Sequence, residues 1–211
     1  MMQGTYYKEW SRVLGREMEF KVYGTAGVPV LALPARGRRA ELQEKYFCYL
    51  TGELAARIRE LNGDADAPLW CVGVDTGAVQ AVNCRLRRPE VFAGAIGLSG
   101  LYDVCRFLGS AEDDLVLRNA PLAYLPEGIV DAKAFAKAEE NHLLLCAGQG
   151  GYEEDAQADT RALAAALAAA SIPAHCEIWG SDVSHDWYWW GKELNIFAER
   201  VFGRDQEKTH A

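Results

Sequence analysis

The chain has 211 residues, half of them apolar and a quarter charged, which is typical of a single globular domain with a sizeable core. Its formal net charge of -8 argues against nucleic acid or an anionic membrane as the main partner. No apolar run approaches the roughly 18 residues that a membrane span needs, and the polar, aromatic first ten residues lack the apolar core of a secretory signal.

Predicted strands and helices alternate along the chain. Glu19–Tyr23 alternates polar and apolar residues, as a half-buried strand does, and Val28–Leu33 is a continuous apolar run that Pro34 ends. A helix is predicted over Ala40–Leu61, because apolar residues recur there every three or four positions before Asn62-Gly63. Further strands are predicted at Leu69–Gly73, Val91–Leu98, Asn141–Gly148 and Ala174–Trp179, and further helices at Ala78–Leu86, Ala156–Ala170 and Leu194–Phe202.

This alternation predicts an α/β fold with a mostly parallel sheet covered on both faces. In such sheets ligands bind beyond the carboxyl ends of the strands. The segment Leu101–Lys137 is long for a connection, and we expect it to form a small cap over the sheet edge. We predict one domain over residues 1–203 and a disordered tail over 204–211.

The stretch Gly73-Val74-Asp75-Thr76-Gly77 has the layout of a nucleophile elbow, a sharp turn from a buried strand into a helix. Small residues are needed on both sides of such a turn, and the two glycines supply them. The central residue then stands at the top of the sheet, beside the positive end of the helix. An acid, Asp75, occupies the position where this layout usually carries serine.

The sequence resembles bacterial esterase-like proteins of the α/β-hydrolase superfamily, from about Tyr6 to Phe202. The segments that carry the resemblance are Tyr7–Ser11, Gly15–Met18, Pro29–Pro34, Gly97–Asp103, Cys146–Gly150 and Trp179–Trp187. The last of these is the most specific, because the superfamily keeps its general base on a histidine after the final strand. Family members fit a helix, a strand and a second helix between Pro34 and Leu69, where only one helix fits here. The resemblance therefore implies a three-layer hydrolase fold trimmed by about one strand.

The resemblance also implies a nucleophile, an acid and a histidine in that chain order, which Asp75, Glu153 and His185 satisfy. It places an oxyanion hole at the backbone N–H groups of Ala35 or Arg36 and of Thr76. The alternatives for the acid are Glu154 and Asp155, and all three acids suit the start of the following helix equally.

Other side chains that could carry chemistry are predicted to have structural roles. His185 could stabilise its loop by bonding Asp75 instead of acting as a base. Ser99, in Gly-Leu-Ser-Gly, is expected to be structural because no suitable helix follows it.

Two functions follow from this set of residues. The first is an esterase-like hydrolase of unknown substrate. A carboxylate is a poor nucleophile toward esters, but in the dehalogenase and epoxide-hydrolase branches an elbow aspartate attacks carbon directly. Those branches need indole or phenol donors, for which Tyr102, Trp187, Tyr188, Trp189 and Trp190 are candidates. The second function is a non-catalytic module that binds a ligand or a protein on the same scaffold.

The remaining residues point to no cofactor. The six cysteines form no CxxC pair and no zinc-like cluster, so we expect reduced core thiols in a cytoplasmic protein. No phosphate loop, dinucleotide fingerprint or metal motif is present, and we predict no cofactor and no metal. The expected partner is a small-molecule ligand or ester substrate, and an edge exposed by the lost strand would favour a homodimer.

Overall fold

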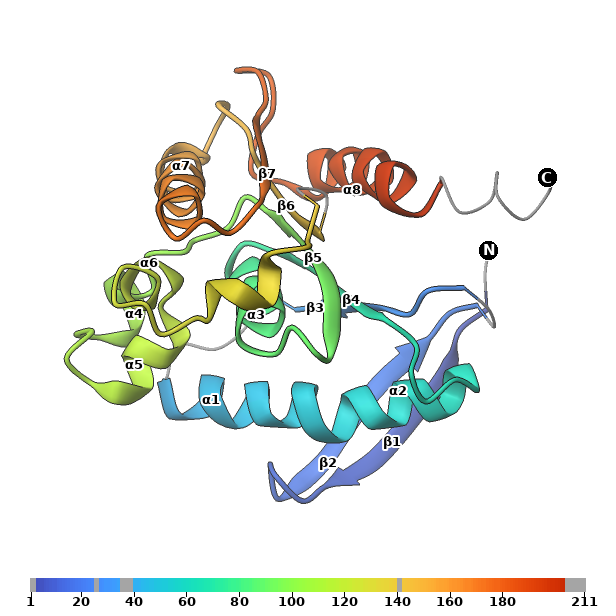
Figure 1. The fold of residues 1–211 in the computed structure, drawn as a ribbon. Coiled ribbons are helices and arrows are strands. Elements are labelled where there is room, and N and C mark those ends of the chain that lie inside the picture. Colours follow the sequence, from blue (N-terminus) through green and yellow to red (C-terminus); the bar gives the residue numbers. More distant parts are fainter. Residues whose placement is uncertain (1–2, 25–26, 35–39, 140–141, 204–211) are drawn as a thin grey trace.

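A computed structural model describes residues 3–24, 27–34, 40–139 and 142–203 (Figure 1). The strands form two sheets. One is an antiparallel ribbon of β1 (Thr5–Ser11) and β2 (Arg16–Val22). The other is a parallel sheet in the order β3-β4-β5-β6-β7, with strands Val30–Leu33, Leu69–Val74, Phe92–Leu98, Leu143–Ala147 and His175–Ile178. The predicted tail over 204–211 lies outside the described residues.

Helices connect these strands. The first helical segment runs without interruption through α1 (Ala40–Cys48), the π-helix η1 (Tyr49–Leu54) and α2 (Ala55–Asn62), and Gly63 ends it in the left-handed conformation. The others are α3 (Thr76–Arg87), α4 (Cys105–Leu108), α5 (Asp114–Asn119), α6 (Pro121–Tyr124), the 3-10 helix η2 (Ala132–Phe135), α7 (Glu154–Ala169) and α8 (Trp187–Phe202). The long connection after β5 thus holds four short helices, from α4 to η2.

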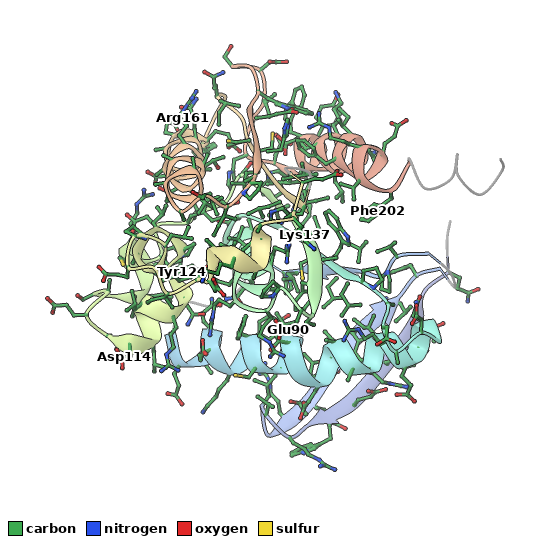
Figure 2. The ribbon with its side chains drawn as sticks, viewed as in Figure 1. Glu90, Asp114, Tyr124, Lys137, Arg161 and Phe202 are labelled. Carbon is green, nitrogen blue, oxygen red and sulfur yellow. The ribbon has the colours of Figure 1, made fainter. Side chains whose placement is uncertain are left out.

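The parallel sheet is covered on both faces. On one face, Trp190 and Phe197 of α8 share a buried apolar cluster with Trp70 and Ile96. Phe202, at the end of α8 (Figure 2), meets Trp70 edge-on with ring centroids 5.2 Å apart. On the other face a larger cluster joins side chains from α1, η1, α3 and α7, including Leu50, Val79, Val82, Leu163 and Leu167. The predicted α/β class with a mostly parallel, doubly covered sheet is confirmed.

The sheet is trimmed in the region that the sequence indicates. Between β3 and β4 the described chain forms only the continuous helical segment from α1 to α2, and no strand. The ribbon of β1 and β2 is separate from the five-stranded sheet, so the described chain leaves a break between β2 and β3 (Figure 1). A further strand in this break would join the two sheets into one.

Some local predictions were wrong. The strand at β1 was missed, and only its partner β2 was recognised, because period-two alternation is weak in Thr5–Ser11. The last helix begins at Trp187 rather than Leu194, since the Asp186 carboxylate accepts hydrogen bonds from the N–H groups of Tyr188 and Trp189 and caps the helix. The predicted strand starting at Asn141 begins at Leu143, and residue 141 lies outside the described ranges.

The cysteines and the helices bear on two further expectations. All six cysteines are free thiols, but Cys48 is exposed and Cys105 and Cys176 are only partly buried, so not all of them are core thiols. No helix in the described part of the chain is long and apolar enough to cross a lipid bilayer.

Candidate active site

Asp75 lies in a strained turn between β4 and α3. Its backbone has φ 54° and ψ -128°, a region that side-chain-bearing residues rarely adopt and that costs about 1–3 kcal/mol. The chain closes tightly around this turn. A Cβ atom at Gly73 would lie 2.1 Å from the Gly77 carbonyl oxygen, and one at Gly77 would lie 2.6 Å from the Leu33 carbonyl oxygen. The sequence therefore needs glycine at both positions, and the turn presents the partly exposed Asp75 at the carboxyl end of β4.

Glu153 and His185 meet at the same end of the sheet. His185 follows β7, and its Nδ1 lies 3.0 Å from Oε1 of Glu153, which precedes α7. The backbone N–H of His185 donates to the Gly151 carbonyl oxygen at 3.0 Å. This bond fixes the loop that carries His185 against the loop after β6. The bond at Nδ1 leaves Nε2 as the ring nitrogen that can receive a proton from water or substrate.

Only one of the three candidate acids contacts the histidine. Glu153 is fully buried, whereas Glu154 and Asp155 are exposed in the first turn of α7. Asp155 instead pairs with Arg106 at 3.2 Å. The geometry thus brings Glu153 together with His185 and leaves the other two acids outside the site.

The Glu153 carboxylate is held by further donors. Ser99 Oγ donates to Oε1 at 2.6 Å, and the Gly148 N–H donates to Oε2 at 3.1 Å. Trp190 Nε1 in turn donates to Ser99 Oγ at 2.9 Å, and the Trp190 ring packs edge-on against His185 with centroids 4.8 Å apart. This network holds both the acid and the imidazole in place, since the oxygens of a buried carboxylate need hydrogen-bond donors.

The surrounding charges raise the pKa of His185. Burial favours the neutral ring and opposes this shift, but the hydrogen bond to Glu153 and the negative charges of Glu153, Asp75 and Glu193 outweigh it. The imidazolium is therefore more stable here than in water. The charge of Asp75 thus contributes to the raised pKa of His185.

A second buried acid lies behind the pair. Glu193 of α8 is fully buried, and its Oε1 accepts a hydrogen bond from Cys146 Sγ at 3.4 Å, while its Oε2 has no hydrogen-bond partner among the described residues. Burial, reinforced by the charge of Glu153, raises the pKa of Glu193 to about 7. Its carboxyl group is thus largely protonated in mildly acidic solution.

The site includes residues that the sequence did not reveal. Ser99 was expected to be structural, and the sequence did not show what it holds: its hydroxyl donates to Glu153, 54 positions away in the chain, and accepts a hydrogen bond from Trp190, 91 positions away. Glu193 was not recognised either, because it lies in the middle of an amphipathic helix. A positive φ of 46° at Ser99 marks its turn as unusual, but this appears only in the folded chain.

The expected oxyanion hole is only partly described. Ala35 and Arg36 lie outside the described residues. Thr76 is the first residue of α3, so its N–H is one of the first-turn groups that have no acceptor within the helix. The cavity beside Thr76, partly lined by Gln80 and Asn119, has a volume of about 10 Å³, enough for about one water molecule.

The aromatic candidates differ in what they can contact. The Trp190 N–H is occupied by Ser99, and Tyr102 is fully buried. Trp187 is 76 % exposed and packs edge-on against Trp190, with centroids 5.0 Å apart. Trp187 therefore lies at the rim of the site. Among the residues that the structure places, no three His, Cys, Asp or Glu side chains converge as metal ligands would.

No model of a known protein family matches the sequence, and no curated protein matches it. Solved structures do match its fold. A ferulic acid esterase aligns with TM-score 0.65 at 16 % identity over 91 % of this chain and 95 % of its own. An S-formylglutathione hydrolase from Agrobacterium tumefaciens aligns with TM-score 0.66 at 14 % identity over 92 % and 94 %.

Another match is MPT51 (FbpC1) from Mycobacterium tuberculosis. Its structure aligns with TM-score 0.72 at 13 % identity over 93 % of this chain and 98 % of its own. Such likeness at low identity shows the fold and no more. The chain has an α/β-hydrolase-like fold.

Proposed function

We propose that this chain is a hydrolase whose attacking group is the Asp75 carboxylate, so that it acts at a saturated carbon and not by the serine-type acyl transfer of an esterase. The observations that support the proposal are the strained turn that presents Asp75 at the carboxyl end of β4, and a histidine that is fixed by Glu153 and whose pKa the charge of Asp75 helps to raise. A carboxylate needs no base to remove a proton before it attacks, and a position at the N-terminus of a helix favours its negative charge.

In the first step one Asp75 oxygen attacks a carbon that bears a leaving group, such as a halide or an epoxide oxygen. The new C–O bond makes an alkyl ester of Asp75, and the leaving group takes the bonding electron pair. A halide departs as the anion, whereas an epoxide oxygen stays attached to the neighbouring carbon and takes a proton from water. Trp187, at the rim, is the aromatic donor best placed to receive that group.

In the second step His185 Nε2 takes a proton from water, and the resulting hydroxide equivalent attacks the carboxyl carbon of the Asp75 ester. Glu153 stabilises the imidazolium and holds the ring orientation. The Thr76 N–H faces the developing oxyanion. Collapse expels the alkoxide, which takes the proton from His185, and the Asp75 carboxyl group then releases its remaining proton to water and is again a carboxylate.

The pH dependence follows from the raised pKa of His185. His185 must be neutral to remove a proton from water, so the second step slows as the pH falls through the pKa of His185. The first step needs only ionised Asp75. At acid pH the alkyl ester should therefore accumulate.

The test compares the wild type with Asp75→Asn, Asp75→Ser and His185→Ala on short haloalkanes, epoxides and acyl esters. We expect the wild type to turn over an alkyl substrate and Asp75→Asn to lose all turnover. His185→Ala should accumulate an alkyl adduct on Asp75 that intact-mass spectrometry detects. In ¹⁸O-water, a single wild-type turnover should place the label first in Asp75 and not in the alcohol.

A second candidate, non-catalytic ligand binding, is favoured by the same raised pKa of His185, since an imidazolium that is bonded to Glu153 and stabilised by the charge of Asp75 forms a stable charged cluster. This reading prevails if the wild type forms no adduct and no product while Asp75→Ser gains esterase activity. That result would mean that His185 and Glu153 can still activate a serine nucleophile. The wild type would then be inactive because Asp75 occupies the position of that serine.

A further inference from the structure

The break between β2 and β3 forms a groove of about 550 Å³. Its two walls are the strands themselves. Among the described residues, β2 pairs only with β1 and β3 pairs only with β4, so each strand presents one edge without ladder partners to the groove. Unpaired N–H and C=O groups on facing edges are complementary to extended backbone, because only a strand can bond both edges along their length.

The two walls run in roughly opposite directions, because the chain turns back between the end of β2 and the start of β3 (Figure 1). β2 ends at Val22 and β3 begins at Val30, and the described residues between them, including Gly24 and Pro29, line one end of the groove. A strand placed between the walls and running with β3 would continue the parallel sheet. It would then be antiparallel to β2.

The floor of the groove is apolar. Met18 and Phe20 of β2 point toward the helices and pack against the main core, as Leu31 and Leu33 of β3 do. The helical segment beneath supplies further apolar and aromatic side chains, namely Tyr46, Tyr49, Leu54, Ile58 and Leu61. An occupant strand would therefore need apolar residues at alternate positions on this side.

The opposite side of the groove carries charge in a defined order. Glu19 and Lys21 are the charged residues among the described lining, and both alternate with the inward-pointing Met18 and Phe20. Glu19 lies 4.0 Å from Lys8, whereas Lys21 forms no ion pair with any described residue. A strand added antiparallel to β2 passes Lys21 before it reaches Glu19. The sequence of that strand that complements both charges therefore has an acid first and a base two residues later.

We propose that this groove binds an extended segment of a partner protein as an added strand, with apolar residues at alternate positions and an acid two residues before a base between them. The opposite charges of Glu19 and Lys21 fit a segment that is neutral overall. The chain's own residues 204–211, Arg-Asp-Gln-Glu-Lys-Thr-His-Ala, offer no apolar side chain larger than alanine for the floor.

The test uses two end-blocked, fluorescent peptides of identical composition, Thr-Val-Glu-Val-Lys-Val-Thr and its charge-reversed form Thr-Val-Lys-Val-Glu-Val-Thr. Fluorescence anisotropy with the full wild-type chain should show about tenfold tighter binding of the first, because two cross-strand pairs change from attraction to repulsion in the second. A peptide with proline in place of the central valine should not bind, since it loses a ladder hydrogen bond.

A double variant, Glu19→Lys with Lys21→Glu, should reverse the preference between the two peptides at unchanged net charge. The matched control reverses an exposed pair on α1 outside the groove lining, Glu41→Lys with Lys45→Glu, and should keep the wild-type preference. Circular dichroism establishes that both variants fold, and the peptide-order comparison on the wild type needs no variant.

Three results would overturn the proposal. The first is that neither peptide binds the wild type at millimolar concentration, or that both bind equally. The second is binding only after removal of residues 204–211, which would make the tail the occupant. The third is that light scattering shows a wild-type dimer at micromolar concentration and a monomeric double variant. A second copy of the chain would then be the occupant.

Discussion

At the scale of single residues, the site consists of groups held in unfavourable states by their neighbours. Asp75 has a positive φ in a turn where the flanking glycines pack closely against the backbone of α3 and the end of β3, and this packing holds the strained conformation. The Glu153 carboxylate can be buried because a serine hydroxyl, a backbone N–H and an imidazole form hydrogen bonds with its two oxygens. Position and charge at the site thus depend on contacts made by residues far apart in the chain.

Glu193 gives a prediction about stability and pH. Its pKa is about 7 in the folded protein, above the ordinary value of 4.5, so the folded chain holds this proton more tightly than the unfolded chain. The stability linked to the proton is complete below about pH 4.5 and is lost as the pH rises through 7. We expect Glu193→Gln, which keeps an acceptor for Cys146, to reduce this loss by about 2 kcal/mol between pH 5 and pH 8.

Urea unfolding of wild type and variant at both pH values measures this difference. The control is Glu199→Gln, which removes an exposed carboxylate from the same helix and should change stability little at either pH. A Glu193→Gln variant whose stability falls with pH in parallel with the wild type would contradict the assignment.

At the scale of elements, the passage from β4 into α3 is the tightest packing in the candidate site. Backbone meets backbone there, so no side-chain rotation can relieve an added methyl group. The helical segment from α1 to α2 contrasts with it, since Gly52 in the π-helix faces open space.

Gly73, in the tight turn, and Gly52, in the π-helix, give a matched pair of substitutions. Gly73→Ala should destabilise the fold by about 3 kcal/mol or more, because its Cβ would lie 2.1 Å from the Gly77 oxygen. Gly52→Ala should stabilise the protein by about 0.5–1 kcal/mol, because alanine loses less backbone entropy in a helix. Thermal and urea unfolding measure both changes, and a tolerated Gly73→Ala would refute the close approach.

At the scale of the whole molecule, stability should be uneven between the two sheets. β4 and β6 are buried along their whole length, and β5 along nearly all of it. By contrast, β1 and β2 expose one face, and β2 lines the groove. The ribbon of β1 and β2 lies apart from the parallel sheet (Figure 1). The ribbon is held mainly by contacts with the helical segment, including the Arg57–Glu9 pair at 2.9 Å. Such a unit can open without disturbing the sheet.

Hydrogen–deuterium exchange tests this difference. Amides of β1 and β2 should exchange at least about tenfold faster than those of β4 to β6, since opening the ribbon exposes little of the main core. The acid-first peptide should slow exchange in β2 and β3 and leave β7, the far edge of the sheet, unchanged. Equal protection of ribbon and sheet in the free protein would show that the two unfold as one unit.

The sequence by itself determined the order of the main strands and helices, the parallel sheet and the turn at Asp75. These follow from local signals: apolar runs, periodicity and glycine spacing act within one element, so they can be recognised without the fold. The last helix was predicted too short because aromatic residues in Trp187–Trp190 hid the cap at Asp186. The strand at Thr5–Ser11 was missed because its less exposed positions hold Tyr7, Glu9 and Ser11, so it lacks the alternation of polar and apolar residues that identified β2.

Only the tertiary structure decided which acid meets His185, what fixes that acid and which strand edges the missing strand leaves unpaired. Three acids adjoin the start of α7, and nothing in their spacing indicates that Glu153 alone turns inward to Ser99 and Gly148. The groove likewise exists because the ends of β2 and β3 are joined while their edges remain apart. Hydrogen bonds and edges between distant segments depend on packing in three dimensions, which local sequence patterns do not encode.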